Sequence, residues 1–193
     1  MASSDRRQAV DALGAGLALP PDITMTTSPT IRRYQEDDRD DVWVLQHLAE
    51  GTLTPAQVPP PKPDDPDYSD FQHIDEVYLQ RGGEFLVGLH EGRTVAMGAI
   101  ERTTAERAAV KRMRVHRDYQ RRGFGRAIMQ ALEARAVELG YSTLHLDTTV
   151  DRVPARQLYL NSGFHETGRT ILGGRWECVL YEKRIAPPRR LFT

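Results

Sequence analysis

One arginine-rich loop holds the residues with the clearest potential for chemistry. It reads Gln120-Arg121-Arg122-Gly123-Phe124-Gly125-Arg126 and stands between a predicted strand and a predicted helix. Glycine has no β-carbon, so a ligand can approach the backbone closely at Gly123 and Gly125. The first amides of a helix carry partial positive charge, and the arginines add full charges at the same place. These residues therefore predict a binding site for a phosphorylated anion.

The spacing within the loop argues against two common nucleotide sites. A dinucleotide-binding loop has a third small residue three positions after its second glycine, where this chain has Ile128. A Walker loop requires Gly-Lys-Ser or Gly-Lys-Thr, and neither occurs in the chain. An ordinary solvated turn with surface arginines is the remaining alternative. The strand before the loop and the periodic helix after it favour the anion site.

The segments on either side must position this loop. Residues 108–115 read as a strand that leads into it. Residues 124–139 place apolar side chains three and four positions apart, which predicts a helix with one apolar stripe. Gly140 follows the last apolar residue, where a left-handed backbone commonly ends a helix. The loop should therefore lie between the end of a strand and the N-terminus of a helix.

Two motifs together resemble a known family. The loop and the strand before it resemble the acyl-CoA pyrophosphate loop of the GNAT superfamily of N-acetyltransferases, whose pattern is Gln/Arg-x-x-Gly-x-Gly/Ala. The later run Leu158–Phe164 resembles the second landmark of that family, a tyrosine followed four residues later by Gly-Phe. The two motifs occur in the family's order. The resemblance covers roughly residues 30–185.

The alternation of strands and helices indicates a mixed α/β (α+β) domain. The resemblance implies, more specifically, a GNAT-like and mostly antiparallel sheet with helices on both faces. Its two central strands, 108–115 and 142–147, would splay apart. We expect the domain to span residues 29–185, after an N-terminal leader over 1–28 that is flexible or a short helix. Residues 186–193 read as a C-terminal tail.

The remaining elements follow from hydrophobic periodicity and turn residues. The predicted strands, besides residues 108–115, cover residues 30–34, 85–89, 94–101, 143–147, 164–167 and 176–183. Shorter helices are predicted over residues 38–50, 68–80 and 154–161.

The resemblance implies acetyl-CoA as the acetyl donor, without a metal, and direct attack by an amine in a ternary complex. Tyr159 would be the general acid beside the departing sulfur, although a core tyrosine bonded to backbone is the alternative. An extended donor arm would bond to strand backbone, as an added strand does. Donor binding is implied for Met113, Arg114, Val115, Gln120, Arg121, Arg122, Gly123, Phe124, Gly125 and Arg126.

The general base is less evident, because Ala109 stands where many members of that family carry a strand glutamate. Glu101, near the end of the preceding strand, is the substitute candidate, and Glu106 is the second. The alternative for both is a solvated surface carboxylate. A chain of water molecules can also remove the proton of an amine without a dedicated base.

The net charge of −1 hides two blocks of opposite sign. Residues 102–126 contain nine Lys/Arg against two Asp/Glu, and residues 35–76 contain twelve Asp/Glu against two Lys/Arg. The acidic block falls in the elements that usually border the acceptor site in the GNAT fold. The hypothesis is therefore a cationic small-molecule amine attracted by Asp70, Asp75 or Glu76. The alternative is that these acidic residues form solvated helix faces, because runs of charged residues usually lie on solvated surfaces.

Composition narrows the remaining function classes. The 193 residues suit one domain, and 39% hydrophobic with 27% charged residues is typical of a globular protein. We expect no membrane partner, because there is no apolar run of spanning length or secretory signal. The lone Cys178 fits the cytoplasm, and the six histidines show no metal-ligand spacing.

The expected protein is thus a monomeric or homodimeric enzyme acting on a small-molecule amine, without nucleic acid. Two other classes stay open. One is a catalytically silent acyl-CoA-binding regulator, which Ala109 permits. The other is a nucleic-acid-binding module that uses the basic block, and its binding should depend steeply on salt.

Overall fold

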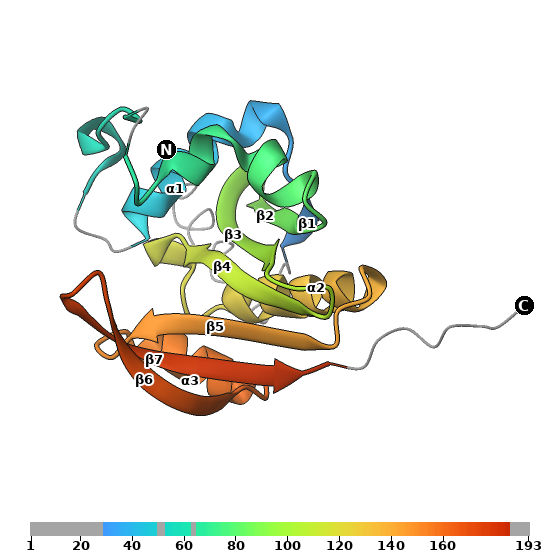
Figure 1. The fold of residues 1–193 in the computed structure, drawn as a ribbon. Coiled ribbons are helices and arrows are strands. Elements are labelled where there is room, and N and C mark those ends of the chain that lie inside the picture. The colour runs from blue at the N-terminus through green and yellow to red at the C-terminus, as the bar shows by residue number, and fades with distance from the viewer. Residues whose placement is uncertain (1–28, 50–52, 63–64, 186–193) are drawn as a thin grey trace, which may run out of the picture.

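The computed structural model describes residues 29–49, 53–62 and 65–185. The expectations for residues 1–28 and 186–193 therefore lie outside the described residues. Seven strands of the described part form one sheet in the order β1-β2-β3-β4-β5-β7-β6 (Figure 1). The strands are β1 Thr30–Arg33, β2 Glu84–His90, β3 Arg93–Arg102, β4 Arg107–Val115, β5 Thr143–Thr149, β6 His165–Leu172 and β7 Trp176–Arg184.

All neighbouring strands are antiparallel except β4 and β5, which are parallel and pair only at one end. Their register runs from Arg107 opposite Thr143 to Ala109 opposite His145. Beyond Ala109, β4 runs on without a described ladder to β5. Arg112 has a φ of 53°, and the register between β3 and β4 shifts at this point. This irregularity lies where β4 separates from β5. The strand pairing as a whole confirms the predicted mostly antiparallel sheet with two central strands that splay apart.

Helices cover both faces of the sheet, as the resemblance implied (Figure 1). Helix α1, Arg39–Leu48, packs over β3 and β4 with a core that includes Phe85, Met97 and Ala99. Helices α2, Phe124–Glu138, and α3, Val153–Asn161, contribute to a second core on the other face. No helix in the described part of the chain is both long and apolar enough to span a bilayer.

The prediction of one helix over residues 68–80 is wrong. The segment forms a 3₁₀ turn at Ser69–Gln72 and a single π-helical turn at Asp75–Leu79. His73 lies between them with φ −133° and ψ 36°, which is not a helical conformation. Three apolar side chains of the segment, Phe71, Ile74 and Tyr78, are nevertheless buried, and Val77 is partly buried. The hydrogen bonds of Asp70 with Arg112 and Tyr78 override the helical periodicity of this segment.

Helix α2 carries the arginine-rich loop at its N-terminus, and its distance from the sheet depends on Gly98 in β3. A β-carbon at Gly98 would lie 2.6 Å from the sulfur of Met113 and 2.7–2.9 Å from side-chain carbons of Ile128 and Leu132. Those distances are too short for real atoms, so any larger residue must displace the side chains that pack between α2 and the sheet.

We therefore expect Gly98→Ala to lower the free energy of unfolding by about 1–3 kcal/mol through overpacking. Urea denaturation would measure the loss. Gly168→Ala in β6 is the matched control, because a β-carbon there meets nothing within 4 Å. Equal stability of the two variants would contradict this view of how α2 is positioned.

Candidate active site

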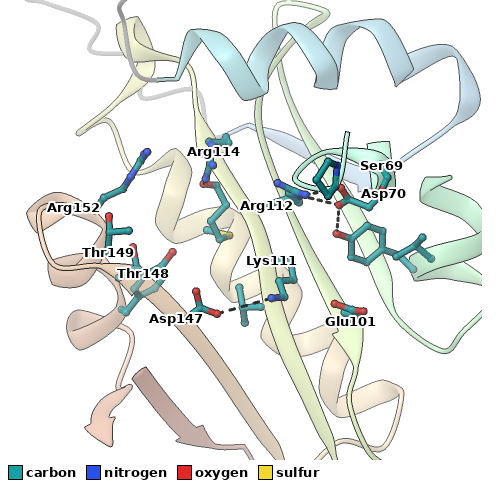
Figure 2. Close-up of a pocket in the computed structure, with 16 residues that line it drawn as sticks. Ser69, Asp70, Glu101, Lys111, Arg112, Arg114, Asp147, Thr148, Thr149 and Arg152 are labelled. Atoms are coloured by element: carbon teal, nitrogen blue, oxygen red, sulfur yellow. Dashed lines mark hydrogen bonds and ion pairs between the residues drawn. The ribbon is translucent and has the colours of Figure 1, made fainter. Parts of the chain in front are cut away.

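A cavity of about 470 Å³ lies where β4 and β5 separate (Figure 2). Four of the residues expected from the sequence to act in catalysis or donor binding line it: Glu101, Met113, Arg114 and Tyr159. The loop residues 120–126 are not part of its wall. The other lining residues come from β4, β5, the turn before α3 and the segment 66–78: Pro66, Ser69, Asp70, Val77, Tyr78, Val110, Lys111, Arg112, Asp147, Thr148, Thr149 and Arg152.

The arginine-rich loop has the backbone geometry of an anion site. Gly123 caps α2 with a φ of 89°, and Arg121 also has a left-handed backbone, with a φ of 60°. Such turns direct backbone amides toward one point, beside the unpaired amides of the first helical turn. A β-carbon at Gly123 would meet nothing within 4 Å. The positive φ therefore favours glycine here, and the space beside it is open.

Other loop residues have structural contacts that the sequence did not reveal. A β-carbon at Gly125 would lie 3.2 Å from Leu158 Cδ2, so this glycine allows close packing against α3. The Gln120 side chain donates to the carbonyls of Ala49, at 2.9 Å, and Val115, at 3.0 Å. The Phe124 side chain is buried, whereas the side chains of Arg121, Arg122 and Arg126 are exposed.

Backbone groups of β4 face the gap between the splayed strands. The His116 amide donates to Val95 of β3 at 2.8 Å. Because backbone groups alternate along a strand, Val115 and Met113 direct theirs away from β3. The Val115 carbonyl accepts from Gln120, and the Met113 carbonyl accepts from the guanidinium of Arg114 at 2.9 Å. A ligand in the gap would thus lie beside polar strand backbone.

Tyr159 of α3 is buried, with 7% of its surface exposed, and it reaches the cavity wall. No hydrogen bond joins its hydroxyl to another of the described residues, so the alternative of a backbone-bonded core tyrosine is not seen. Burial raises the pKa of Tyr159 to about 12, although the charges of Arg114 and Arg152 oppose the rise. The hydroxyl therefore stays protonated at neutral pH and can donate a proton.

Glu101 lies directly beside Ala109. The register pairs Glu101 of β3 with Ala109 of β4, and Ala109 with His145 of β5. Directly paired residues point to the same face of a sheet, so the small alanine is flanked by a carboxylate and an imidazole. Glu101 also lines the cavity, whereas Glu106 is exposed and does not.

His145 was missed in the sequence. Its Nε2 lies 3.0 Å from the hydroxyl of Thr103. Burial and the charges of Arg107 and Lys111 hold the pKa of His145 below its ordinary value, so the ring is neutral at neutral pH. Within the described part of the chain, no group of three or more His, Cys, Asp and Glu residues could hold a metal ion.

The strongest polar contact at the cavity joins Arg112 to Asp70. Arg112 Nε and Nη2 donate to the two carboxylate oxygens of Asp70 at 2.8 and 2.5 Å, and both side chains are at most 20% exposed. The Tyr78 hydroxyl donates to the same carboxylate at 2.5 Å. The guanidinium also lies over the ring of Phe71, 4.8 Å from its centroid. This network fixes the segment 66–78 against β4.

The network argues against the hypothesis that Asp70, Asp75 or Glu76 attracts a cationic amine. Asp70 lines the cavity, but its carboxylate is already bound by Arg112 and Tyr78. Asp75 and Glu76 are exposed and lie outside the cavity lining, and Glu76 is 3.4 Å from His73. The three carboxylates therefore do not form an attractive site for a cationic amine.

We expect Asp70→Ala to lower the free energy of unfolding by about 3 kcal/mol, because it leaves the Arg112 guanidinium buried without its carboxylate. Urea denaturation would measure the loss, with the exposed Asp75→Ala as the control, expected within about 0.5 kcal/mol of the parent. A loss in Asp70→Ala no larger than that of the control would show that the network does not hold the segment.

Lys111 and Asp147 complete the cavity wall. Lys111 Nζ lies 3.9 Å from Asp147 Oδ1, and both side chains are about 40% exposed (Figure 2). Neither was singled out in the sequence. The sequence held one indication of Asp147, because Thr143, His145 and Asp147 are polar at every second position of the predicted strand.

Comparisons with known proteins agree with this geometry. The model of the acetyltransferase (GNAT) family matches residues 43–164. The chain is similar to the N-acetylaspartate synthetase of Xenopus tropicalis, with 28% identity over 102 residues, or 52% of this chain and 38% of that protein. The chain thus spans well under half the length of this curated relative.

Solved structures share the fold. A GNAT-family acetyltransferase from Staphylococcus aureus Mu50 matches with a TM-score of 0.67 and 18% identity, over 82% of this chain and 99% of that chain. A GNAT-superfamily phosphinothricin acetyltransferase from Sinorhizobium meliloti, solved in complex with acetyl-CoA, matches with a TM-score of 0.66 and 14% identity. That match covers 82% of this chain and 89% of the other.

Proposed function

The chain belongs to the acetyltransferase (GNAT) family, whose model matches well over half of its 193 residues, and we propose that it is an acetyl-CoA-dependent N-acetyltransferase. An amine would attack the donor directly within a ternary complex. The observation that carries the proposal is the gap between β4 and β5, with the arginine-rich, glycine-capped loop after the end of β4 and the buried Tyr159 at the cavity wall. The related synthetase, by its name, forms an N-acetyl product.

Acetyl-CoA would be held along β4. The amides around Gly123 and the side chains of Arg121, Arg122 and Arg126 suit its phosphates. The strand backbone at Met113 and Val115 suits the extended arm of the donor, by the same hydrogen bonds that pair strands. Gln120 and Phe124 would act on the donor through the position of the loop, since their side chains have partners within the protein.

Two side chains would handle protons. Tyr159 would protonate the departing sulfur, because its burial keeps the hydroxyl protonated and its position keeps it at the cavity. Glu101 would accept the proton of the amine. It lies on β3 directly opposite Ala109 of β4, the position where the family resemblance implies a glutamate. The donor supplies a thioester whose leaving group is a stable thiol.

We expect Gly123→Ala to raise the KM for acetyl-CoA about 10-fold. A left-handed backbone costs alanine about 1–2 kcal/mol, so the loop would leave the conformation that directs its amides toward one point. Steady-state kinetics with varied acetyl-CoA would measure it. Gly140→Ala is the matched control: it has the same φ of 89° at the opposite end of α2, also with nothing within 4 Å. A KM that rises equally in both variants would count against a donor-binding role for the loop.

The function itself is tested by amine-dependent release of thiol from acetyl-CoA, with the acetylated product identified by mass. Intersecting initial-velocity lines are expected for direct transfer, whereas parallel lines would indicate an acetyl-enzyme. Binding of acetyl-CoA without thiol release for any amine would favour the alternative of a catalytically silent regulator, which the alanine at position 109 still permits.

A further inference from the structure

Two charged side chains on the sheet side of the cavity, Lys111 and Asp147, have no role in the reaction proposed above. Glu101, Lys111 and Asp147 lie on the adjacent strands β3, β4 and β5, and all three line the cavity. The register places them on one face, since Lys111 is two residues after Ala109 and Asp147 is two residues after His145. The sign of the charge alternates across the three strands (Figure 2).

Lys111 is poorly satisfied by its only described ionic neighbour. Its Nζ is 3.9 Å from Asp147 Oδ1, which is beyond hydrogen-bonding distance, and both side chains are about 40% exposed. Such half-exposed ion pairs contribute about 0–1 kcal/mol. Lys111 can therefore leave Asp147 for a ligand at little cost. By contrast, Arg112 on the same strand donates to Asp70 from both Nε and Nη2.

The position of Lys111 places it away from the donor phosphates. It lies four residues before the end of β4 at Val115, which is about 13 Å along a strand, and the anion-binding loop follows that end. It is instead a diagonal neighbour of Glu101, and the backbones of such positions are about 7–8 Å apart. The Lys111 ammonium and the Glu101 carboxylate both line the cavity, which suits a small molecule that carries both an anionic group and an amine.

We propose that the acceptor is an amine that also carries a carboxylate, such as an amino acid, and that Lys111 binds this carboxylate while the amine faces Glu101. This proposal rests on the proposed function, because it takes the cavity as the acceptor site. It replaces the cationic amine expected from the acidic block, since Asp70 is neutralised by Arg112. Lys111 is a specificity-determining residue in this arrangement.

The test compares free L-amino acids with their carboxamides as acceptors, with thiol release as the signal. The amide keeps the amine and loses the negative charge, and its amine is less basic, so greater reactivity of the acid cannot come from a larger share of neutral amine. We expect the free acids to have a kcat/KM at least about 10-fold higher, the value of one charged hydrogen bond.

Lys111→Met removes the charge and keeps most of the stem. We expect it to raise the KM for the free acid about 10- to 100-fold, without changing the KM for acetyl-CoA. Lys111→Arg should retain most of the preference. Asp147→Asn should lower the KM for the acid, because it removes the competing carboxylate. Amides that react as well as the acids, or a preference that survives in Lys111→Met, would overturn the proposal while leaving the acetyltransferase function intact.

A binding experiment separates the two proposals if no amine supports turnover. Free amino acids and their amides are titrated calorimetrically into the protein with coenzyme A present. Selective binding of the acids that is lost in Lys111→Met supports the acceptor inference even when the transferase function fails. Absence of selective binding overturns the inference.

Discussion

Tyr159→Phe should lower kcat about 100-fold, with little change in the KM for acetyl-CoA. The substitution removes only the hydroxyl. No described residue bonds to that hydroxyl, so the core should keep its packing and no buried polar partner should be left behind. What is lost is the proton for the departing sulfur. Steady-state kinetics and a thermal melt of the same variant measure the two effects separately.

Tyr181→Phe provides the control for that substitution. Tyr181 is buried beside Tyr159, with ring centroids 6.1 Å apart, but its hydroxyl is bonded to Arg156 at 3.1 Å and it does not line the cavity. We expect its kcat to stay within about 3-fold of the parent, with a stability loss of about 1 kcal/mol. Equal kinetic losses in the two variants would mean that Tyr159 acts through packing alone.

The pH dependence follows from the burial of Tyr159. The acid form of a group with a raised pKa is retained up to that pKa, here about 12. Tyr159 should therefore cause no alkaline fall in kcat below about pH 11. A tyrosine-dependent fall nearer pH 9, absent from Tyr159→Phe, would show that the hydroxyl is not buried as described.

Glu101→Gln should lower kcat/KM for the amine about 100-fold at neutral pH, where most amine is protonated and must lose a proton before it attacks. The loss should shrink as the pH rises toward the pKa of the amine, because the neutral nucleophile then forms without a base. The pH profile of kcat/KM, compared between parent and variant, measures both features.

Glu106→Gln is the matched control for this base. Glu106 belongs to the turn between β3 and β4, its side chain is exposed, and it lies outside the cavity lining. Its activity should equal that of the parent at every pH. A pH-independent loss in Glu101→Gln would indicate binding or stability in place of proton transfer, and full activity would direct attention to a water chain.

Local periodicity predicted most of the elements, because the two cores repeat at helical and strand spacing. The long helix ends at Glu138, and Gly140 shortly after it has a φ of 89°, as the pattern indicates. The segment 68–80 failed for a physical reason. Asp70 bonds Arg112, which is 42 residues away, and a window on the sequence contains no information on such a contact.

Short sequence motifs indicated one part of the candidate site, whereas the part that depends on strand register was not identified. The loop at residues 120–126 and Tyr159 are readable from neighbouring residues. By contrast, the proximity of Glu101 to Ala109 requires the exact pairing of β3 and β4, which shifts at a bulge. The meeting of Lys111 with Asp147 requires two strands that are far apart in the chain. The alternation of polar residues along 143–147 indicated that one face of this strand is not packed in the core, but it did not identify Lys111 as the neighbour of Asp147.

The most direct test of the account is calorimetric titration of the protein with acetyl-CoA, with NAD and ATP as controls. The account predicts that acetyl-CoA binds at least about 10-fold more tightly than either control, because only it has both the phosphates for the loop and the arm for the β4 backbone. Binding no tighter than that of ATP would contradict the central claim, since the loop would then be a general basic surface and the gap between β4 and β5 would have no donor to hold.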